Sequence, residues 1–71
     1  MQIDRTALKR KVEDAGTTFD NLATELGIDR STLFRRLRTC TIRLIDILKI
    51  QKLLHLTQQE VFDIFFASIV A

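Results

Sequence analysis

The chain contains no proline, no tryptophan and no tyrosine, and only two glycines among its 71 residues. Proline and glycine are the residues that most often break helices and form turns, so their scarcity favours helices throughout. Few β-branched residues alternate with polar ones, as they would in a half-buried strand. With 46% apolar and 28% charged residues, the chain does not have the composition of a disordered tail. We therefore expect an all-α protein with a single domain over residues 1–71.

Residues that catalysis and metal binding require are also scarce. Cys40 is the only cysteine and His55 the only histidine, and no glycine-rich phosphate loop is present. Neither residue has a second ligand or a general base at a suitable spacing. We expect no enzyme, no metal, no cofactor and no small-molecule substrate. One cysteine also excludes an internal disulfide framework and fits a reducing cytoplasm.

Long apolar runs are missing as well. No stretch approaches the roughly 18 apolar residues of a membrane-spanning helix. The first residues do not show a basic segment followed by an apolar one, the pattern of a secretory signal. We expect a cytoplasmic protein without a membrane partner.

The residues that are present predict five helices. We place them over about residues 4–15, 18–26, 29–38, 42–54 and 58–69. Each segment begins at, or directly after, a side chain that can cap a helix N-terminus: Asp4, Thr18, Asp29, Thr41 and Thr57, the last with Glu60 as a capping box. In the fourth helix we expect the core face to consist of Leu44, Ile47, Leu48, Ile50 and Leu54.

The second and third predicted helices form the unit around which the chain is organised. Helical spacing at i, i+3, i+4 and i+7 connects Phe19, Leu22, Ala23 and Leu26. Gly27 suits a tight turn because glycine tolerates a positive φ, and Ile28 follows as an apolar plug. The next helix carries Leu33 and Leu37 inward. This order is typical of a helix-turn-helix.

The outward side of the third helix is rich in arginine. At about 100° per residue, Ser31, Phe34, Arg35 and Arg38 lie opposite the core positions. Residues 30–43 hold five arginines and no acid. Such a patch is typical of a phosphate-binding surface, although a solvated helix face is the simpler alternative.

These residues resemble a known family. The segment LATELGIDRSTLFRRL is similar to the helix-turn-helix of the Cro/CI-type (XRE) regulators of temperate phages and bacteria, with Ala23, Gly27, Ile28 and Leu33 at the family's spacing. The ending LTQQEVFDIFF is similar to the last helix of many small members. The resemblance implies a compact five-helix bundle of the lambda-repressor type in a bacterial host cell. It also implies that the helix over 29–38 binds double-stranded operator DNA in a phage lysis/lysogeny switch.

Two groups of site residues follow from this resemblance and from the arginine patch. The residues expected to contact DNA bases or a partner are Arg30, Ser31, Phe34, Arg35 and Arg38. Those expected to bind phosphate are Thr18, Arg36 and Arg43.

Phe34 supports an alternative function. Family members often place a polar, base-reading side chain at its position, whereas an aromatic between arginines is a good anchor for a protein interface. The chain is also similar to the small Cro-like modulators of repression. Such an antirepressor binds a CI-type repressor and alters its DNA binding. The residues leave both alternatives open.

The C-terminal segment is apolar nearly all round, which is unusual for a helix in so small a protein. We predict that it forms a homodimer or partner interface. The residues expected there are Ile64, Phe65, Phe66, Ile69 and Val70.

Overall fold

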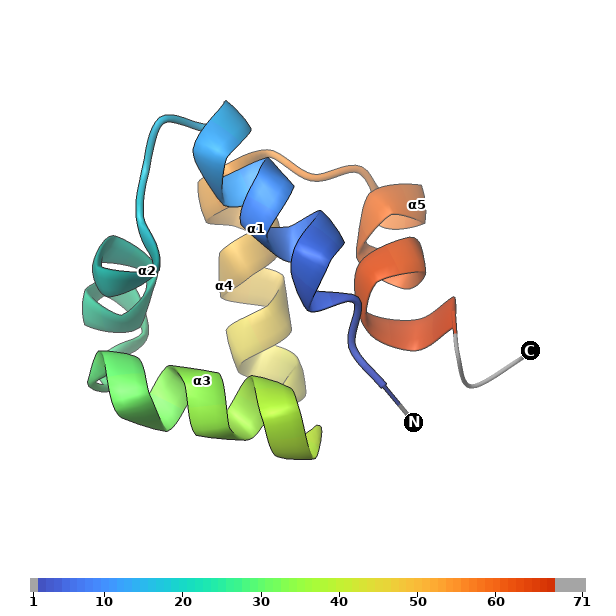
Figure 1. The fold of residues 1–71 in the computed structure, drawn as a ribbon. Helices are drawn as coiled ribbons and strands as arrows, with labels where there is room; N and C mark the ends of the chain where they lie inside the picture. The colour runs from blue at the N-terminus through green and yellow to red at the C-terminus, as the bar shows by residue number, and fades with distance from the viewer. Residues whose placement is uncertain (1, 68–71) are drawn as a thin grey trace.

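The computed structural model describes residues 2–67 of the chain. It contains helices and no strand within those residues, which confirms the all-α prediction. The elements in order are α1 (Arg5–Asp14), α2 (Phe19–Leu26), α3 (Arg30–Thr39), α4 (Leu44–Leu54), α5 (Gln58–Val61) and a π-helical turn, η1 (Phe62–Phe66) (Figure 1). α2 lies on one side of α1, and α5 with η1 lies on the other, while α4 runs behind α1 (Figure 1).

One hydrophobic core joins all of these elements. Its buried members are Leu8 and Val12 from α1, Leu22, Ala23 and Leu26 from α2, Leu33 and Leu37 from α3, Ile47, Ile50 and Leu54 from α4, and Ile3, Leu56, Val61, Ile64 and Phe65. Ala23 is 2% exposed, and its small side chain lets neighbouring helices approach. The described residues fit within 32 × 23 × 20 Å.

Four of the predicted N-terminal caps are present. Asp4 accepts a hydrogen bond from the Ala7 N–H at 3.0 Å. Thr18 and Asp29 cap α2 and α3 in the same way. Thr57 and Glu60 form the reciprocal capping box that opens α5. Each cap satisfies a backbone N–H that has no partner inside its own helix.

The turn between α2 and α3 depends on Gly27. This residue has φ +74°, the left-handed conformation that ends helices and that side chains with a Cβ adopt at a cost. The N–H of Ile28 donates to the Ala23 carbonyl at 3.0 Å, which closes the end of α2. Ile28 itself packs half-buried against the core, as the sequence predicted.

The prediction that Thr41 caps the fourth helix is wrong. α3 runs one residue further than expected, to Thr39, and Cys40 follows as its C-cap with φ +56°. The Thr41 N–H then donates to the Arg36 carbonyl at 2.9 Å, so Thr41 closes α3 instead of opening α4. α4 begins at Leu44 with Arg43 in the cap position and no side-chain cap.

The predicted core face of the fourth helix is also partly wrong. Ile47, Ile50 and Leu54 are buried, but Leu44 and Leu48 are 63% and 48% exposed. Asp46 is completely buried. Its carboxylate lies on the same side of α4 as the three buried apolar residues and forms ion pairs with two arginines, while the two leucines lie on the opposite side.

The C-terminal segment differs from the predicted helix over 58–69. Four residues of α-helix in α5 pass into the wider π-helical turn η1, and residues 68–71 lie outside the described part of the chain. The Asp4 N–H donates to the Ile64 carbonyl at 2.8 Å, and Lys11 of α1 forms an ion pair with Glu60 of α5. The beginning of the chain is thereby fixed to its last described helical turn.

Candidate interaction surface

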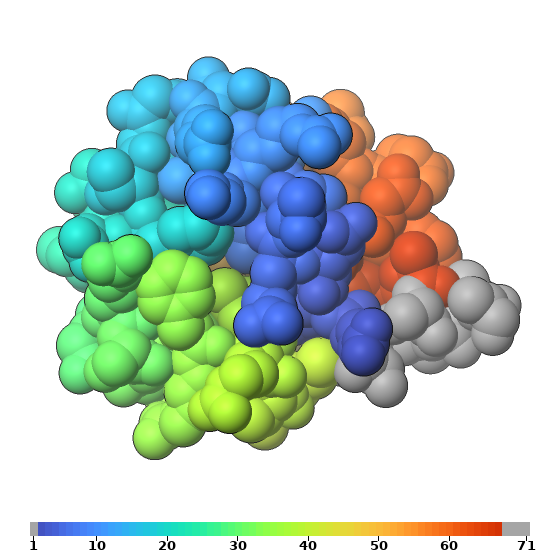
Figure 2. Space-filling model, viewed as in Figure 1, coloured from blue at the N-terminus to red at the C-terminus, as the bar shows by residue number. Residues whose placement is uncertain are grey.

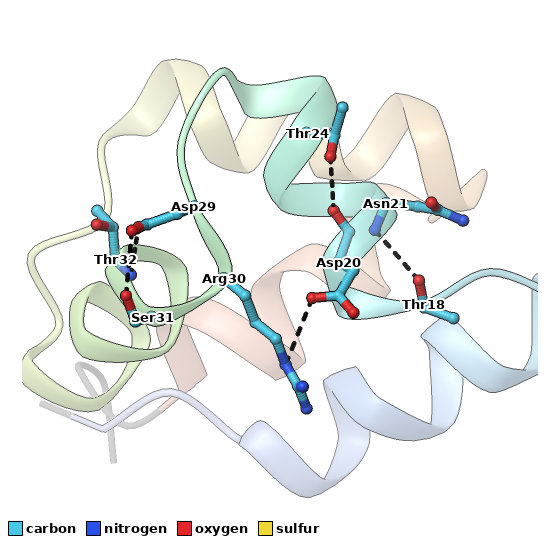
Figure 3. A network of polar contacts seen from close by, with 8 residues as sticks. All are labelled: Thr18, Asp20, Asn21, Thr24, Asp29, Arg30, Ser31 and Thr32. Atoms are coloured by element: carbon cyan, nitrogen blue, oxygen red, sulfur yellow. Dashed lines mark hydrogen bonds and ion pairs between the residues drawn. The ribbon is translucent and has the colours of Figure 1, made fainter.

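Polar contacts gather at the N-terminal ends of α2 and α3, and one ion pair joins the two helices (Figure 3). The Thr18 hydroxyl accepts a hydrogen bond from the Asn21 N–H at 3.2 Å, and Asp20 lies in the same first turn. Arg30, the first residue of α3, faces Asp20, with Nε 3.7 Å from Oδ1. Thr18 is therefore a cap, as predicted, and its phosphate contact stays a prediction.

Asp29 organises the first turn of α3. Its carboxylate accepts hydrogen bonds from the Thr32 N–H at 2.9 Å and from the Ser31 hydroxyl at 3.2 Å (Figure 3). Hydrogen bonds from the Thr32 side chain and backbone, with a smaller contribution from Ser31, lower the pKa of Asp29. Ser31 is exposed, but its hydroxyl already has an acceptor inside the protein.

Phe34 does not stand free on the outward side of α3. It is half-buried, and its ring packs against Phe19 of α2 with centroids 4.9 Å apart. The Arg30 guanidinium carbon lies 5.2 Å from the Phe34 ring centroid, within the range of a cation–π contact. The sequence placed this ring opposite the core, so its partial burial is a correction. The ring that covers Phe34 is that of Phe19, the first residue of α2, and only the structure shows that the two rings meet.

A groove of about 380 Å³ adjoins this aromatic pair where α1, α2 and α3 meet, on the side of the molecule shown in Figure 2. Its lining consists of Arg5, Thr6 and Lys9 from α1, Phe19 from α2, and Phe34 and Leu37 from α3. Two cations and no carboxylate line it. We call the groove, the two rings and Arg30 the aromatic–arginine surface.

Two of the predicted phosphate-binding arginines have a carboxylate partner. Arg43 donates from Nε and Nη2 to the two carboxylate oxygens of Asp46, at 3.0 and 3.2 Å. Arg36 approaches the same carboxylate, with Nη1 3.7 Å from Oδ2. The count of five arginines without an acid missed Asp46 because it lies in the next helix. The i, i+3 spacing of Arg43 and Asp46 was the signal available in the sequence.

Arg35 and Arg38 differ from these residues. Both are exposed on α3, and neither forms an ion pair with any residue between 2 and 67. Among the predicted DNA-contacting residues, these two retain fully available donors.

The predicted C-terminal interface is wrong in its central residues. Ile64 and Phe65 are 3% and 1% exposed and belong to the core of the single chain. Phe66 packs partly buried against that core. Ile69 and Val70 lie outside the described residues. The large exposed apolar side chains instead gather on α4, with Phe62 as the additional one.

Among residues 2–67, no group of three His, Cys, Asp or Glu side chains is placed to hold a metal ion. No helix in this part of the chain has the length and apolar character needed to cross a membrane.

The chain matches no protein-family model, and no curated protein or solved structure is significantly similar to it.

Proposed function

We propose that the unit of α2, its turn and α3 is a helix-turn-helix, and that this protein is a small regulator of a phage-type genetic switch. The support is the arrangement of two short helices joined at Gly27, with Leu33 and Leu37 of α3 buried and an arginine-rich side exposed. The resemblance of this segment to the Cro/CI-type regulators points the same way. The protein acts in the cytoplasm of a bacterial host and performs no catalytic step.

Its direct partner in this proposal is a CI-type repressor, which makes it an antirepressor. The observation that carries this choice is the half-buried Phe19–Phe34 pair between α2 and α3, with the Arg30 guanidinium carbon 5.2 Å from the Phe34 ring centroid. A half-buried ring already held by its neighbour loses little freedom on binding, and aromatic and arginine side chains are enriched where protein interfaces are strongest.

Charge supports the same choice. Asp20 and Asp29 carry carboxylates in the first turn of α2 and at the cap of α3, where a DNA phosphate would approach a helix-turn-helix. Three of the five arginines between residues 30 and 43 already face a carboxylate of the chain. A protein partner with its own acids near apolar side chains complements this surface better than a uniform row of phosphates does.

The test is a calorimetric titration with a purified CI-type repressor. Phe34→Ala should weaken the complex by about 30-fold, which corresponds to a central aromatic contact of roughly 2 kcal/mol. Phe62→Ala is the matched control, because Phe62 is an exposed phenylalanine outside the aromatic–arginine surface. Absence of a complex at micromolar concentrations, or equal effects of the two changes, would refute the proposal.

A second candidate function is direct binding of operator DNA by α3. One observation favours it: Arg35 and Arg38 are exposed, and neither forms an ion pair with another described residue. In this case Arg30, Ser31 and Arg35 contact base edges in the major groove, and Thr18 and Arg38 contact phosphate. A two-fold dimer would read half-sites about one DNA turn apart.

Duplex binding measured over a series of salt concentrations decides this second candidate. Arg35→Ala should reduce both the affinity for operator sequence and the steepness of the salt dependence. If operator and random duplex bind equally and Arg35→Ala has no effect, DNA is not the direct partner. Because Phe34→Ala reports on the repressor and Arg35→Ala on the duplex, the same two variants separate the candidates.

A further inference from the structure

The outer side of α4 is apolar although it faces solvent. Four of its side chains are large, hydrophobic and exposed: Leu44 at 63%, Ile45 at 52%, Leu48 at 48% and Leu53 at 37%. At about 100° per residue they share one half of the helix with Lys49 and Lys52, while Ile47, Ile50 and Leu54 occupy the buried half. We call these six exposed residues the α4 outer face.

The grouping of these residues is more informative than their exposure. Single exposed leucines are ordinary on protein surfaces, whereas apolar side chains gathered on one helix face mark interaction sites. Leu44 and Leu48 are four residues apart and therefore lie one above the other, as anchors do in a helix-to-helix contact. The aliphatic parts of the two lysines extend the apolar area to its rim.

The charge of this face selects the kind of partner. Asp46 is the only acid in α4, and it is buried against Arg36 and Arg43. Lys49 and Lys52 are therefore the only charged residues of the α4 outer face. Two copies packed through this face would bring four lysines along one seam, which like-charge repulsion disfavours. A partner with acids beside an apolar stripe would instead pair with them.

We propose that the α4 outer face binds an acidic amphipathic helix of a partner protein. The aliphatic stripe of that helix packs on Leu44, Ile45 and Leu48, and its flanking carboxylates pair with Lys49 and Lys52. The inference does not rest on the proposed function. α4 runs behind α1 in Figure 1, and no residue of α4 lines the groove of the aromatic–arginine surface. Little of α4 is visible in the same view in Figure 2.

Two synthetic 18-residue peptides test this inference. Both carry leucines at i, i+3, i+4 and i+7, flanked by glutamates in one peptide and by lysines in the other. Fluorescence anisotropy with the full-length protein should show micromolar binding of the glutamate peptide and at least ten-fold weaker binding of the lysine peptide. Added salt should reduce the difference.

Variants of the α4 outer face make the test specific. Leu44→Ser with Leu48→Ser should weaken binding of the glutamate peptide at least ten-fold while the circular dichroism spectrum stays unchanged, because both side chains are exposed. Lys49→Glu with Lys52→Glu should reverse the preference between the peptides, an outcome that partial unfolding cannot produce. Phe34→Ala, on the other surface, should leave peptide binding unchanged.

Several outcomes would overturn the inference. Equal binding of the two peptides, or binding that survives both double substitutions, would show that α4 does not select an acidic helix. A dimer in sedimentation equilibrium that Leu44→Ser with Leu48→Ser abolishes would assign the face to a second copy. Binding to phosphatidylglycerol vesicles without peptide binding would assign it to a membrane surface. If the protein binds neither a repressor nor DNA, the proposed function is refuted, but the inference about the α4 outer face still depends only on the peptide assay.

Discussion

Replacement of Asp46 by asparagine should destabilise the fold, although the new side chain has nearly the same shape. The Asp46 carboxylate is completely buried and lies between Arg36 and Arg43, joining the end of α3 to the start of α4. Asparagine retains one oxygen acceptor and replaces the other oxygen with an NH2 donor. The guanidinium groups would then face a neutral group that partly repels them.

The magnitude follows from the burial of the two partners. Removal of one member of a fully buried ion pair typically costs about 3–5 kcal/mol, because the other charge is left without a partner. Arg36 keeps 26% of its side chain exposed and lies 3.7 Å from the carboxylate, and Arg43 keeps 59% exposed, so only part of that cost applies. We expect a loss of about 2–3 kcal/mol in the free energy of unfolding. In a domain of this size that loss lowers Tm by roughly 10–20 °C.

Urea denaturation followed by circular dichroism measures the loss directly. Asp63→Asn is the matched control, because it makes the same change of charge at an exposed carboxylate whose bonded partner is Gln59. The control should change the unfolding free energy by less than about 0.5 kcal/mol. If the two variants are equally stable, the buried ion pair does not join α3 to α4 in the way described.

Three further predictions concern the caps, the aromatic pair and the dependence on pH. Thr57→Ala should lower the free energy of unfolding, measured by urea denaturation, by about 1 kcal/mol, whereas Thr41→Ala should lower it by less than about 0.5 kcal/mol. Of these two threonines, Thr57 caps α5 with its side chain and Thr41 caps no helix N-terminus, so equal losses would contradict this. A double-mutant cycle with Phe19→Ala and Phe34→Ala should give a coupling energy of about 0.5–1.5 kcal/mol, and a value near zero would show that the rings do not stabilise each other. The hydrogen bond from Lys11, followed by that from the Thr57 backbone, lowers the pKa of Glu60 from 4.5 to about 2. The stability that Glu60 contributes is therefore complete above pH 4.5 and lost as the pH falls toward 2. In the Glu60→Gln variant the urea concentration at the unfolding midpoint should depend less on pH over this range, and an unchanged pH dependence would refute the assignment.

The sequence predicted the local features of the fold well because local chemistry determines them. Thr18 and Asp29 cap the helices that follow them, since the hydrogen bonds they accept come from residues three positions away. Gly27 ends α2 because few other residues adopt its positive φ cheaply. Thr41 has the same side chain as Thr18, but its N–H donates to a carbonyl at the end of α3. Sequence alone does not show whether such a threonine closes the preceding helix or caps the next one.

Features that depend on tertiary contacts were predicted less well. Hydrophobicity placed Leu44 and Leu48 in the core, but the buried side of α4 consists of Asp46, paired with two arginines, and of Ile47, Ile50 and Leu54. Two arginines of the predicted patch, Arg36 and Arg43, likewise form ion pairs with the Asp46 carboxylate. Ile64 was assigned to an interface because a short chain was expected to leave its last helix uncovered, whereas the N-terminal residues cover it.

The hydrogen bond from the Asp4 N–H to the Ile64 carbonyl also has a kinetic consequence. It joins residues 60 positions apart, so the intervening chain must be in place before the bond forms. The Asp4 amide proton therefore exchanges with solvent only when the two ends of the fold separate, and its exchange rate reports opening of the first helix from the last turn.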